Sequence, residues 1–279
     1  MTADARAVES LLAFWADAGV TQTDADAPVD RTAETVQAMQ AKAVQRQVTP
    51  LRPAAAATAA PRPALPAAAP EPVVDISEAR RLAAGAESLE ALEAAIAAFD
   101  GCPLKTAGGA TRSVFARGNP QAPLFVIGEG PGQTEDREGK PFVGRAGQLL
   151  DRMLAAAGLE DRVFISNTVF WRPPGNRDPA PSEQAACAPF LERAIELVAP
   201  RLILVLGAPA TKFVLRQQGG ILSLRGRWFE WRSEDETRVI PALPTLHPAF
   251  LLRQPSAKKK AWEDLLTLTD RLDRPERPA

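Results

Sequence analysis

Residues 124–150 constrain the fold of this chain more than any other stretch. They begin with four apolar residues, Leu124 to Ile127, which indicate a short strand buried on both faces. A glycine-rich loop follows at 128–132, and backbone at glycine can approach a ligand closely. Apolar residues that recur at helical spacing from Leu149 then predict a core-packed helix. A strand, a polar glycine loop and a helix in this order are typical of sites at the carboxyl ends of strands in open α/β sheets.

Strand-like and helix-like segments alternate along the chain beyond this stretch. Strands are expected at 124–127, 163–166, 202–206 and 239–246, and helices at 146–157, 182–198, 208–216 and 256–272. Residues 222–232 alternate in polarity like one further hairpin strand at the side of this layer. Alternation of strands and helices predicts a mostly parallel sheet covered on both faces, which is a three-layer α/β/α sandwich.

The first 72 residues differ in composition from the remainder. Residues 1–20 include a short amphipathic helix, which either docks on its own domain or binds a protein partner. Residues 21–72 are rich in Ala and Pro, so they bury little apolar surface and are expected to be a disordered linker. The folded domain is therefore expected to span 73–279.

Composition excludes several classes of protein. No apolar run approaches the length of a membrane helix, and no charged n-region precedes an apolar run at the N-terminus. Two cysteines far apart argue against a disulfide framework and suit a reducing compartment. We therefore expect a cytoplasmic protein, monomeric and without membrane contact.

The net charge of −1 conceals an acidic N-terminal segment, since the first 40 residues hold seven acids against two arginines. The remaining chain is mildly basic, which permits nucleic-acid binding without requiring it.

Three polar residues stand where predicted strands end: Glu129, Asn167 and His247. A lone histidine is more often structural than catalytic, and His247 is the only histidine of the chain. Its place after a strand and before Pro248 raises the odds of a functional role, because parallel strand ends meet at one edge of the sheet.

Five motifs follow one another in this chain: Gly128-Glu-Gly-Pro-Gly132, Gly139-Lys-Pro-Phe-Val-Gly-Arg-Ala-Gly-Gln148, Ile165-Ser-Asn-Thr168, Arg172-Pro-Pro-Gly-Asn-Arg177 and His247-Pro-Ala-Phe-Leu-Leu-Arg253. Each is weak alone, but the series resembles the family four uracil-DNA glycosylases over roughly residues 100–268. The resemblance implies a four-stranded parallel sheet between helices. It also implies hydrolysis of the N-glycosidic bond between uracil and deoxyribose in a flipped nucleotide.

The resemblance assigns base recognition to the first three motifs. Asn167 would donate to uracil O4 and accept from N3–H, whereas cytosine presents the reverse pattern. Phe142 would stack on the pyrimidine, with Gly128 and Gly130 allowing close approach of the backbone.

The resemblance assigns the chemistry to His247 and a carboxylate. His247 would donate a hydrogen bond to uracil O2 as negative charge develops on the leaving base. Glu129 would orient the attacking water or balance the cationic sugar, and Glu135 is the alternative carboxylate for this role. The segment 241–246 before the histidine contains no basic residue, which favours simple hydrolysis over covalent bonding to the abasic sugar.

DNA contacts are expected from residues around these motifs. In the Pro-rich loop, the candidates for DNA contact are Arg172, Asn176 and Arg177. Either Leu251 or Leu252 could insert into the space that the flipped base leaves in the stack. Arg253 and Lys258 to Lys260 are the candidates for binding phosphate groups.

The chain departs from the family at its metal site. Family members typically hold a [4Fe-4S] cluster on four cysteines, and the matching positions here are Phe99, Cys102, Trp171 and Cys187. Because clusters of this kind need four thiolates, we expect no metal and no cofactor in this chain, with the two aromatic rings filling the space.

Two other functions remain open from the sequence. The lost ligands are compatible with a non-catalytic DNA-binding module that tethers a repair partner. The same fold acting on another deaminated base is the second alternative.

Overall fold

The computed structural model describes residues 76–106 and 109–274. The helix expected within 1–20 and the linker expected at 21–72 lie outside the described residues. Within the described ranges, no helix is both long and apolar enough to cross a membrane.

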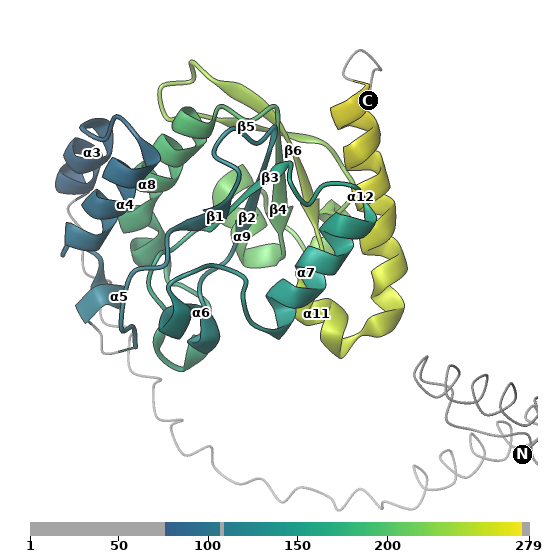
Figure 1. Ribbon diagram of the computed structural model, residues 1–279, viewed down its shortest axis with the longest axis horizontal. Coiled ribbons are helices and arrows are strands. Elements are labelled where there is room, and N and C mark those ends of the chain that lie inside the picture. The colour runs from purple at the N-terminus through teal and green to yellow at the C-terminus, as the bar shows by residue number, and fades with distance from the viewer. Residues whose placement is uncertain (1–75, 107–108, 275–279) are drawn as a thin grey trace, which may run out of the picture. The chain divides into compact units, whose positions relative to one another are not determined.

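One sheet of six strands forms the centre of the described part of the chain (Figure 1). In spatial order, its strands are β1 (Ala116–Gly118), β3 (Val163–Asn167), β2 (Leu124–Gly128), β4 (Leu202–Leu206), β6 (Val239–Thr245) and β5 (Phe229–Arg232). The four inner strands are parallel, whereas β1 and β5 pair antiparallel at the two edges. The predicted parallel sheet is therefore confirmed. The antiparallel edge strand β5 lies within the hairpin strand expected at 222–232, and β1 is one edge strand that the sequence did not predict.

Helices cover both faces of the sheet, which confirms the three-layer sandwich. They are α3 (Ser77–Ala84), α4 (Leu89–Ala98), α5 (Pro103–Thr106), α6 (Gln133–Glu138), α7 (Arg145–Ala156), α8 (Pro181–Val198), α9 (Ala208–Leu215), α10 (Ile221–Leu224), α11 (Pro248–Arg253) and α12 (Lys258–Asp273). Two short 3₁₀ turns lie at Pro174–Asn176 and Pro255–Ala257.

Alternate residues of β2 divide between two apolar clusters. Phe125 and Ile127 pack in the cluster that includes residues of α3, α4, α8 and α9. Leu124 and Val126 pack in the cluster that includes residues of α7 and α12. Figure 1 shows these two groups of helices on opposite sides of the sheet. Because every residue of β2 is buried, the strand reads as a continuous apolar run rather than an alternating one.

The expected strand at 222–232 is correct only in its second half. Residues Ile221–Leu224 form the short helix α10, with Gly220 at its N-cap, and the chain then turns through Gly226 at φ 72°. Only Phe229–Arg232 pairs with β6, and there Trp231 is buried between exposed neighbours. Glycines on both sides of α10 allow the direction changes that a straight strand would not need.

The order of the strands creates a switch point at the sheet centre. From β2 the chain crosses to β3 on one side, and from β4 it crosses to β6 on the other. Ligands of open α/β sheets bind outside the carboxyl ends of strands at such a point. The loops after β2 and β4 are therefore where a site is expected.

Candidate active site

A cavity of about 670 Å³ lies at this switch point. Its lining includes Glu129 and Gly130 after β2, Gly207 after β4, and His247 after β6. Phe142 and Glu135 also line it, from the segment between β2 and α7. The structure thus brings together most of the residues that the sequence predicts for base binding and chemistry.

Asn167 lies at the end of β3 with an unpartnered amide. Its side chain is 1% exposed, and neither Oδ1 nor Nδ2 has a hydrogen-bond partner in the structure. A buried amide is expected to be paired, so two unsatisfied atoms on one side chain point to a ligand that supplies both partners. The amide therefore has the properties of a recognition group.

Gly128 is the point where Asn167 and Phe142 meet. A Cβ built on Gly128 would lie 2.5 Å from Asn167 Oδ1 and 2.3 Å from Phe142 Cζ. Both distances are far below van der Waals contact, so any larger residue at 128 would displace the amide or the ring. Close packing here explains the glycine at 128, which has an ordinary strand conformation.

Phe142 is buried and holds an uncommon backbone conformation. Its φ is 54°, in the left-handed region that bulky residues rarely adopt. Its ring centroid lies 5.8 Å from that of His247, with the planes tilted by 36°. The ring thus lies beside the imidazole of His247 and close to the amide of Asn167.

His247 caps α11 and is neutral. Its Nδ1 accepts a hydrogen bond from the backbone N–H of Ala249 at 3.2 Å, so the ring proton of the neutral form sits on Nε2. Burial lowers the pKa of His247 to about 4, and the positive charge of Arg253 adds to the effect. At neutral pH the imidazole therefore offers an uncharged Nε2–H donor.

Glu129 differs from His247 because its charge changes near neutral pH. Burial raises its pKa to about 7, and Asp178 adds to this through its charge and a hydrogen bond between the two carboxyl groups. Asp178 lines the same cavity and was missed by the sequence analysis. Its only signal in the sequence is a carboxylate inside the Pro-rich loop.

Glu135 is occupied by the backbone. Its Oε1 accepts from the N–H groups of Val143 and Gly144 at 3.1 and 2.8 Å, and its Oε2 accepts from that of Gly132 at 3.2 Å. A carboxylate with three backbone donors is held in place rather than available for water. The structure therefore favours Glu129 over Glu135 as the carboxylate that faces a ligand.

Thr168 fixes the backbone on which Glu129 is carried. Its N–H donates to Gly128 O at 2.9 Å, and its hydroxyl donates to Glu129 O at 2.6 Å. Gln184 of α8 in turn donates to that hydroxyl at 3.2 Å. These contacts tie the loop after β2 to the end of β3. The sequence analysis placed Thr168 at the end of a motif without assigning it a role, and it did not single out Gln184.

Comparison with known proteins identifies the family. The model of the uracil DNA glycosylase superfamily matches residues 115–266, more than half of the chain. The type-4 uracil-DNA glycosylase of Sulfurisphaera tokodaii is 39% identical over 173 residues, 60% of this chain and 78% of that protein. The protein of the same name from Thermotoga maritima is 39% identical over 172 residues, 61% and 86%. This chain belongs to the type-4 family of the uracil DNA glycosylase superfamily.

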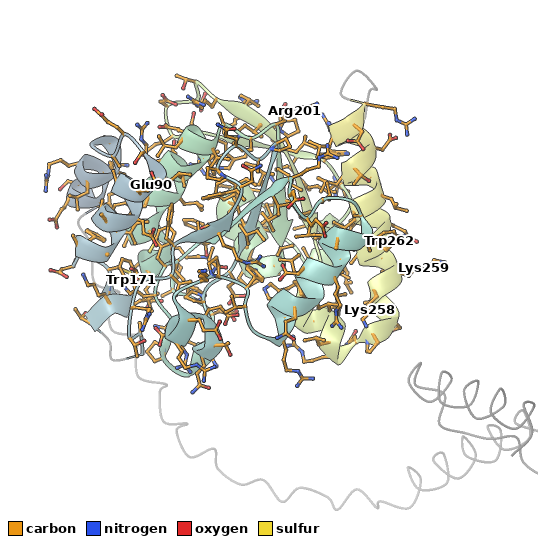
Figure 2. All side chains as sticks on the ribbon, in the orientation of Figure 1. Glu90, Trp171, Arg201, Lys258, Lys259 and Trp262 are labelled. Atoms are coloured by element: carbon orange, nitrogen blue, oxygen red, sulfur yellow. The ribbon has the colours of Figure 1, made fainter. Side chains whose placement is uncertain are left out.

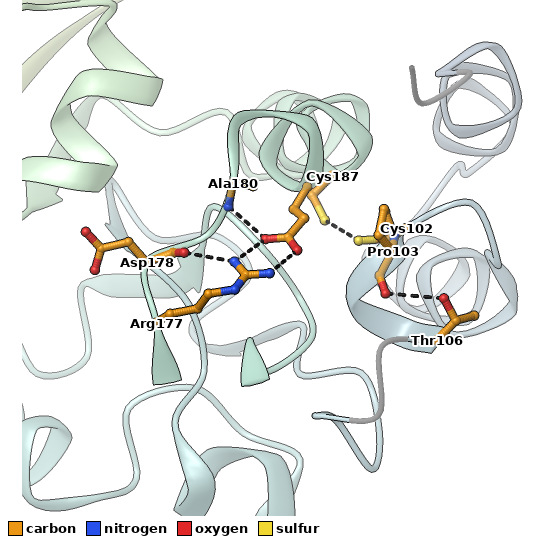
Figure 3. A network of polar contacts seen from close by, with 8 residues as sticks. Cys102, Pro103, Thr106, Arg177, Asp178, Ala180 and Cys187 are labelled. Atoms are coloured by element: carbon orange, nitrogen blue, oxygen red, sulfur yellow. Dashed lines mark hydrogen bonds and ion pairs between the residues drawn. The ribbon is translucent and has the colours of Figure 1, made fainter. Parts of the chain in front are cut away.

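Some of the residues expected to contact DNA line the cavity, whereas others lie outside it. Asn176, Arg177 and Arg253 line the cavity, and Arg172 donates to Asn176 Oδ1 at 2.7 Å beside it. Arg177 also pairs with Glu183 of α8 through two hydrogen bonds, of 2.8 and 2.5 Å (Figure 3). Lys258 is exposed at the start of α12, outside the cavity lining (Figure 2).

Of the two candidates for a wedge residue, Leu251 or Leu252, the structure buries Leu251. Its side chain is 0% exposed and packs with Leu149 and Leu246 in a small apolar cluster. Leu252 is 36% exposed and turns the other way, since successive residues of a helix point about 100° apart. Leu252 remains the candidate for this role.

The cluster that the family resemblance implies does not fit the residues present. The Sγ atoms of Cys102 and Cys187 lie 3.9 Å apart, and both thiols are buried (Figure 3). Phe99 and Trp171, at the other two positions, are buried aromatic side chains that cannot ligate iron. Over 76–106 and 109–274, no group of three or more His, Cys, Asp or Glu is arranged to hold a metal ion. Two thiolates fall short of the four that a [4Fe-4S] cluster needs.

The contact between Glu129 and Asp178 yields a prediction. In Asp178→Asn, the like charge is removed, so the pKa of Glu129 should fall below the wild-type value of about 7. The measurement is a titration of side-chain carboxyl carbons by NMR, with Glu129 assigned through Glu129→Gln. Asp100→Asn is the matched control, because Asp100 is an exposed acid outside the cavity lining. A Glu129 midpoint that is the same in Asp178→Asn and wild type would contradict the contact.

Proposed function

We propose that this protein excises uracil from DNA by hydrolysing the N-glycosidic bond of a flipped nucleotide. The observation that carries the proposal is the unpartnered amide of Asn167, buried beside an aromatic ring and a neutral histidine. Uracil offers the missing partners, because its O4 accepts from Nδ2–H while its N3–H donates to Oδ1. The names of the type-4 relatives agree with this substrate.

Phe142 provides the surface on which the base stacks. Stacking of a base on an aromatic side chain typically contributes about 1–3 kcal/mol and does not depend on base identity. Selectivity for uracil therefore rests on the Asn167 amide, with Phe142 supplying affinity. The loop at Gly128 and Gly130 lets backbone N–H groups approach the base without intervening side chains.

His247 stabilises the leaving base. As the glycosidic bond breaks, negative charge develops on the uracil ring, including O2, and Nε2–H of His247 donates a hydrogen bond to it. A neutral donor suits this task, because the low pKa of His247 keeps the acidic imidazolium form unpopulated at neutral pH, and the N–H of a neutral imidazole is too weak an acid to be transferred outright. The base therefore leaves as an anion held by hydrogen bonds.

Glu129 acts on the sugar. Breaking the bond leaves a cationic, oxocarbenium-like deoxyribose, whose charge lowers the pKa of a nearby carboxyl and holds Glu129 ionised. The carboxylate then orients water for attack and balances the positive charge. Products are free uracil and an abasic site, with no covalent bond to the protein.

DNA binds at the rim of the cavity through Arg172, Asn176, Arg177 and Arg253, with Lys258 reaching phosphates farther along α12. Contacts of this kind position the duplex without reading sequence. Leu252 enters the space that the flipped base leaves.

Substitution of Asn167 tests the function directly. In Asn167→Asp, an acceptor replaces the donor that O4 requires, so uracil excision should fall on the order of 100-fold or more. Excision is followed on an oligonucleotide with one uracil, cut with alkali at the abasic site. Asn119→Asp, at a surface turn, is the matched control and should retain wild-type rates. Wild-type protein that binds uracil DNA without releasing the base would favour a DNA-binding module instead. A wild-type preference for hypoxanthine or xanthine would favour another deaminated base.

The proposed enzyme works without an iron–sulfur cluster. Phe99 and Trp171 fill the volume near the two thiols, with Phe99 packed on Phe190 at 5.2 Å and Trp171 on Phe170 at 6.3 Å between ring centroids. Packed rings leave no room for four irons, since interiors are close-packed. Cys102 and Cys187 then serve as small buried hydrophobes.

Iron content tests the loss of the cluster. Protein purified without oxygen should be colourless, with far less than one iron per chain and no visible thiolate-to-iron absorbance. Cys102→Ala should cost only its packing, while Trp171→Cys should destabilise the fold by roughly 3–5 kcal/mol through the cavity it opens. A brown protein with four irons per chain would overturn the proposal.

The catalytic domain of the proposed enzyme spans 73–279 and acts as a monomer in the cytoplasm. Residues 1–20 and 21–72 then act as a tethered segment for a protein partner rather than in the chemistry. A chain that begins at Val73 should excise uracil at the full-length rate in the same oligonucleotide assay. A truncated chain that fails to fold or loses activity would show that the first 72 residues complete the domain.

A further inference from the structure

The backbone on both sides of Phe142 is held by two charged side chains. From one side, Arg117 of β1 donates through Nε to Pro141 O at 2.8 Å and through Nη2 to Phe142 O at 3.2 Å. From the other side, Glu135 accepts from the N–H groups of Val143 and Gly144. Each of the four residues 141–144 thus has a backbone C=O or N–H group in a charge-assisted hydrogen bond, which is stronger than a neutral one, so three successive peptide groups are fixed.

Arg117 is itself fixed in place. Its Nη2 pairs with Asp151 of α7 at 2.5 Å, and its side chain is largely shielded from solvent. The guanidinium therefore connects the edge strand β1, the segment at 141–142 and the helix α7. A planar fork with several donors can make these contacts at once, which an ammonium group cannot.

The segment needs such support because of how Phe142 is arranged. A left-handed φ of 54° is unfavourable for a bulky residue, so the backbone would relax to another region if released. The space is also tight, since a Cβ on Gly147 would lie 1.8 Å from Phe142 O. Relaxation of φ would rotate the ring away from Gly128 and from the amide of Asn167.

We propose that Arg117 is a positioning residue, which holds Phe142 in its left-handed conformation so that the ring is preset for stacking. Arg117 is absent from the cavity lining and from the motifs that carry the family resemblance. It acts only through the carbonyl groups of Pro141 and Phe142. This inference rests on the proposed function, because the preset ring is taken to be the stacking surface for uracil.

A four-variant cycle tests the proposal: wild type, Arg117→Met, Phe142→Ala and the double variant. Single-turnover uracil excision should fall about tenfold in Arg117→Met, since misplacement by about 1 Å at a site can cost up to about 100-fold. In the Phe142→Ala background, the same change should cost less than about twofold, because the ring through which Arg117 acts is gone. An equal loss in both backgrounds would overturn the proposal.

Two further variants calibrate the cycle. Arg162→Met removes an arginine that pairs with Asp273 at 2.7 Å away from the site and should leave excision unchanged. Arg117→Lys keeps the charge but loses the fork, so its rate should lie between those of wild type and Arg117→Met. A lysine variant as slow as the methionine variant, with both folded, would still support a role for the bidentate geometry; one faster than wild type would oppose it.

Hydrogen exchange provides a readout independent of activity. In Arg117→Met the amide protons of Val143 and Gly144 should exchange faster, while the thermal midpoint stays close to that of wild type. Unchanged exchange of these two amide protons would overturn the proposal that Arg117 holds this segment, even if uracil excision fell. If the wild type released no uracil, the proposed function would fail, and faster exchange in Arg117→Met would still establish that Arg117 holds this segment.

Discussion

Parallel pairing of β3, β2, β4 and β6 is the constraint on which the rest of the structure depends. Four parallel strands must have their carboxyl ends at the same edge of the sheet, and the backbone N–H and C=O groups of these inner strands are paired with the neighbouring strands. Glu129, Asn167 and His247 are separated by up to 118 positions in sequence, yet they meet because each lies at or just after the end of one of these strands. Helices pack on both faces of the sheet and shield the strands from solvent.

The side chains proposed to act on the base and the sugar carry little fixed charge of their own. Burial lowers the pKa of His247, which keeps the imidazole neutral, and raises the pKa of Glu129 to about 7, so that this carboxyl group is only partly ionised at neutral pH. The amide of Asn167 carries no charge. Arg177 and Arg253 line the same cavity and supply positive charge that would attract a polyanion. A neutral imidazole and a neutral amide suit a reaction in which opposite charges appear on base and sugar only as the bond breaks.

Much of this arrangement can be read from the sequence, because buried strands, glycine loops and polar strand ends leave strong local signals. β1 leaves none: three residues, Ala116–Gly118, show no periodicity, and their pairing is decided by β3. Leu251 and Leu252 look alike in the sequence, and only the packing of α11 against α7 decides which one is buried. Arg117 and Asp178 are ordinary charged residues locally, and their importance comes from partners brought near by the fold.

The unpaired amide of Asn167 sets folding against recognition. A buried group without partners costs the folded state about 1–3 kcal/mol, and no protein group in the described part of the chain pairs with this amide. A base that supplies both hydrogen bonds recovers this free energy at the moment of binding. An apolar residue of similar volume at 167 would make the free protein more stable, but it could not form hydrogen bonds to the base. Selection for stability alone would therefore remove the residue on which the proposed base recognition depends.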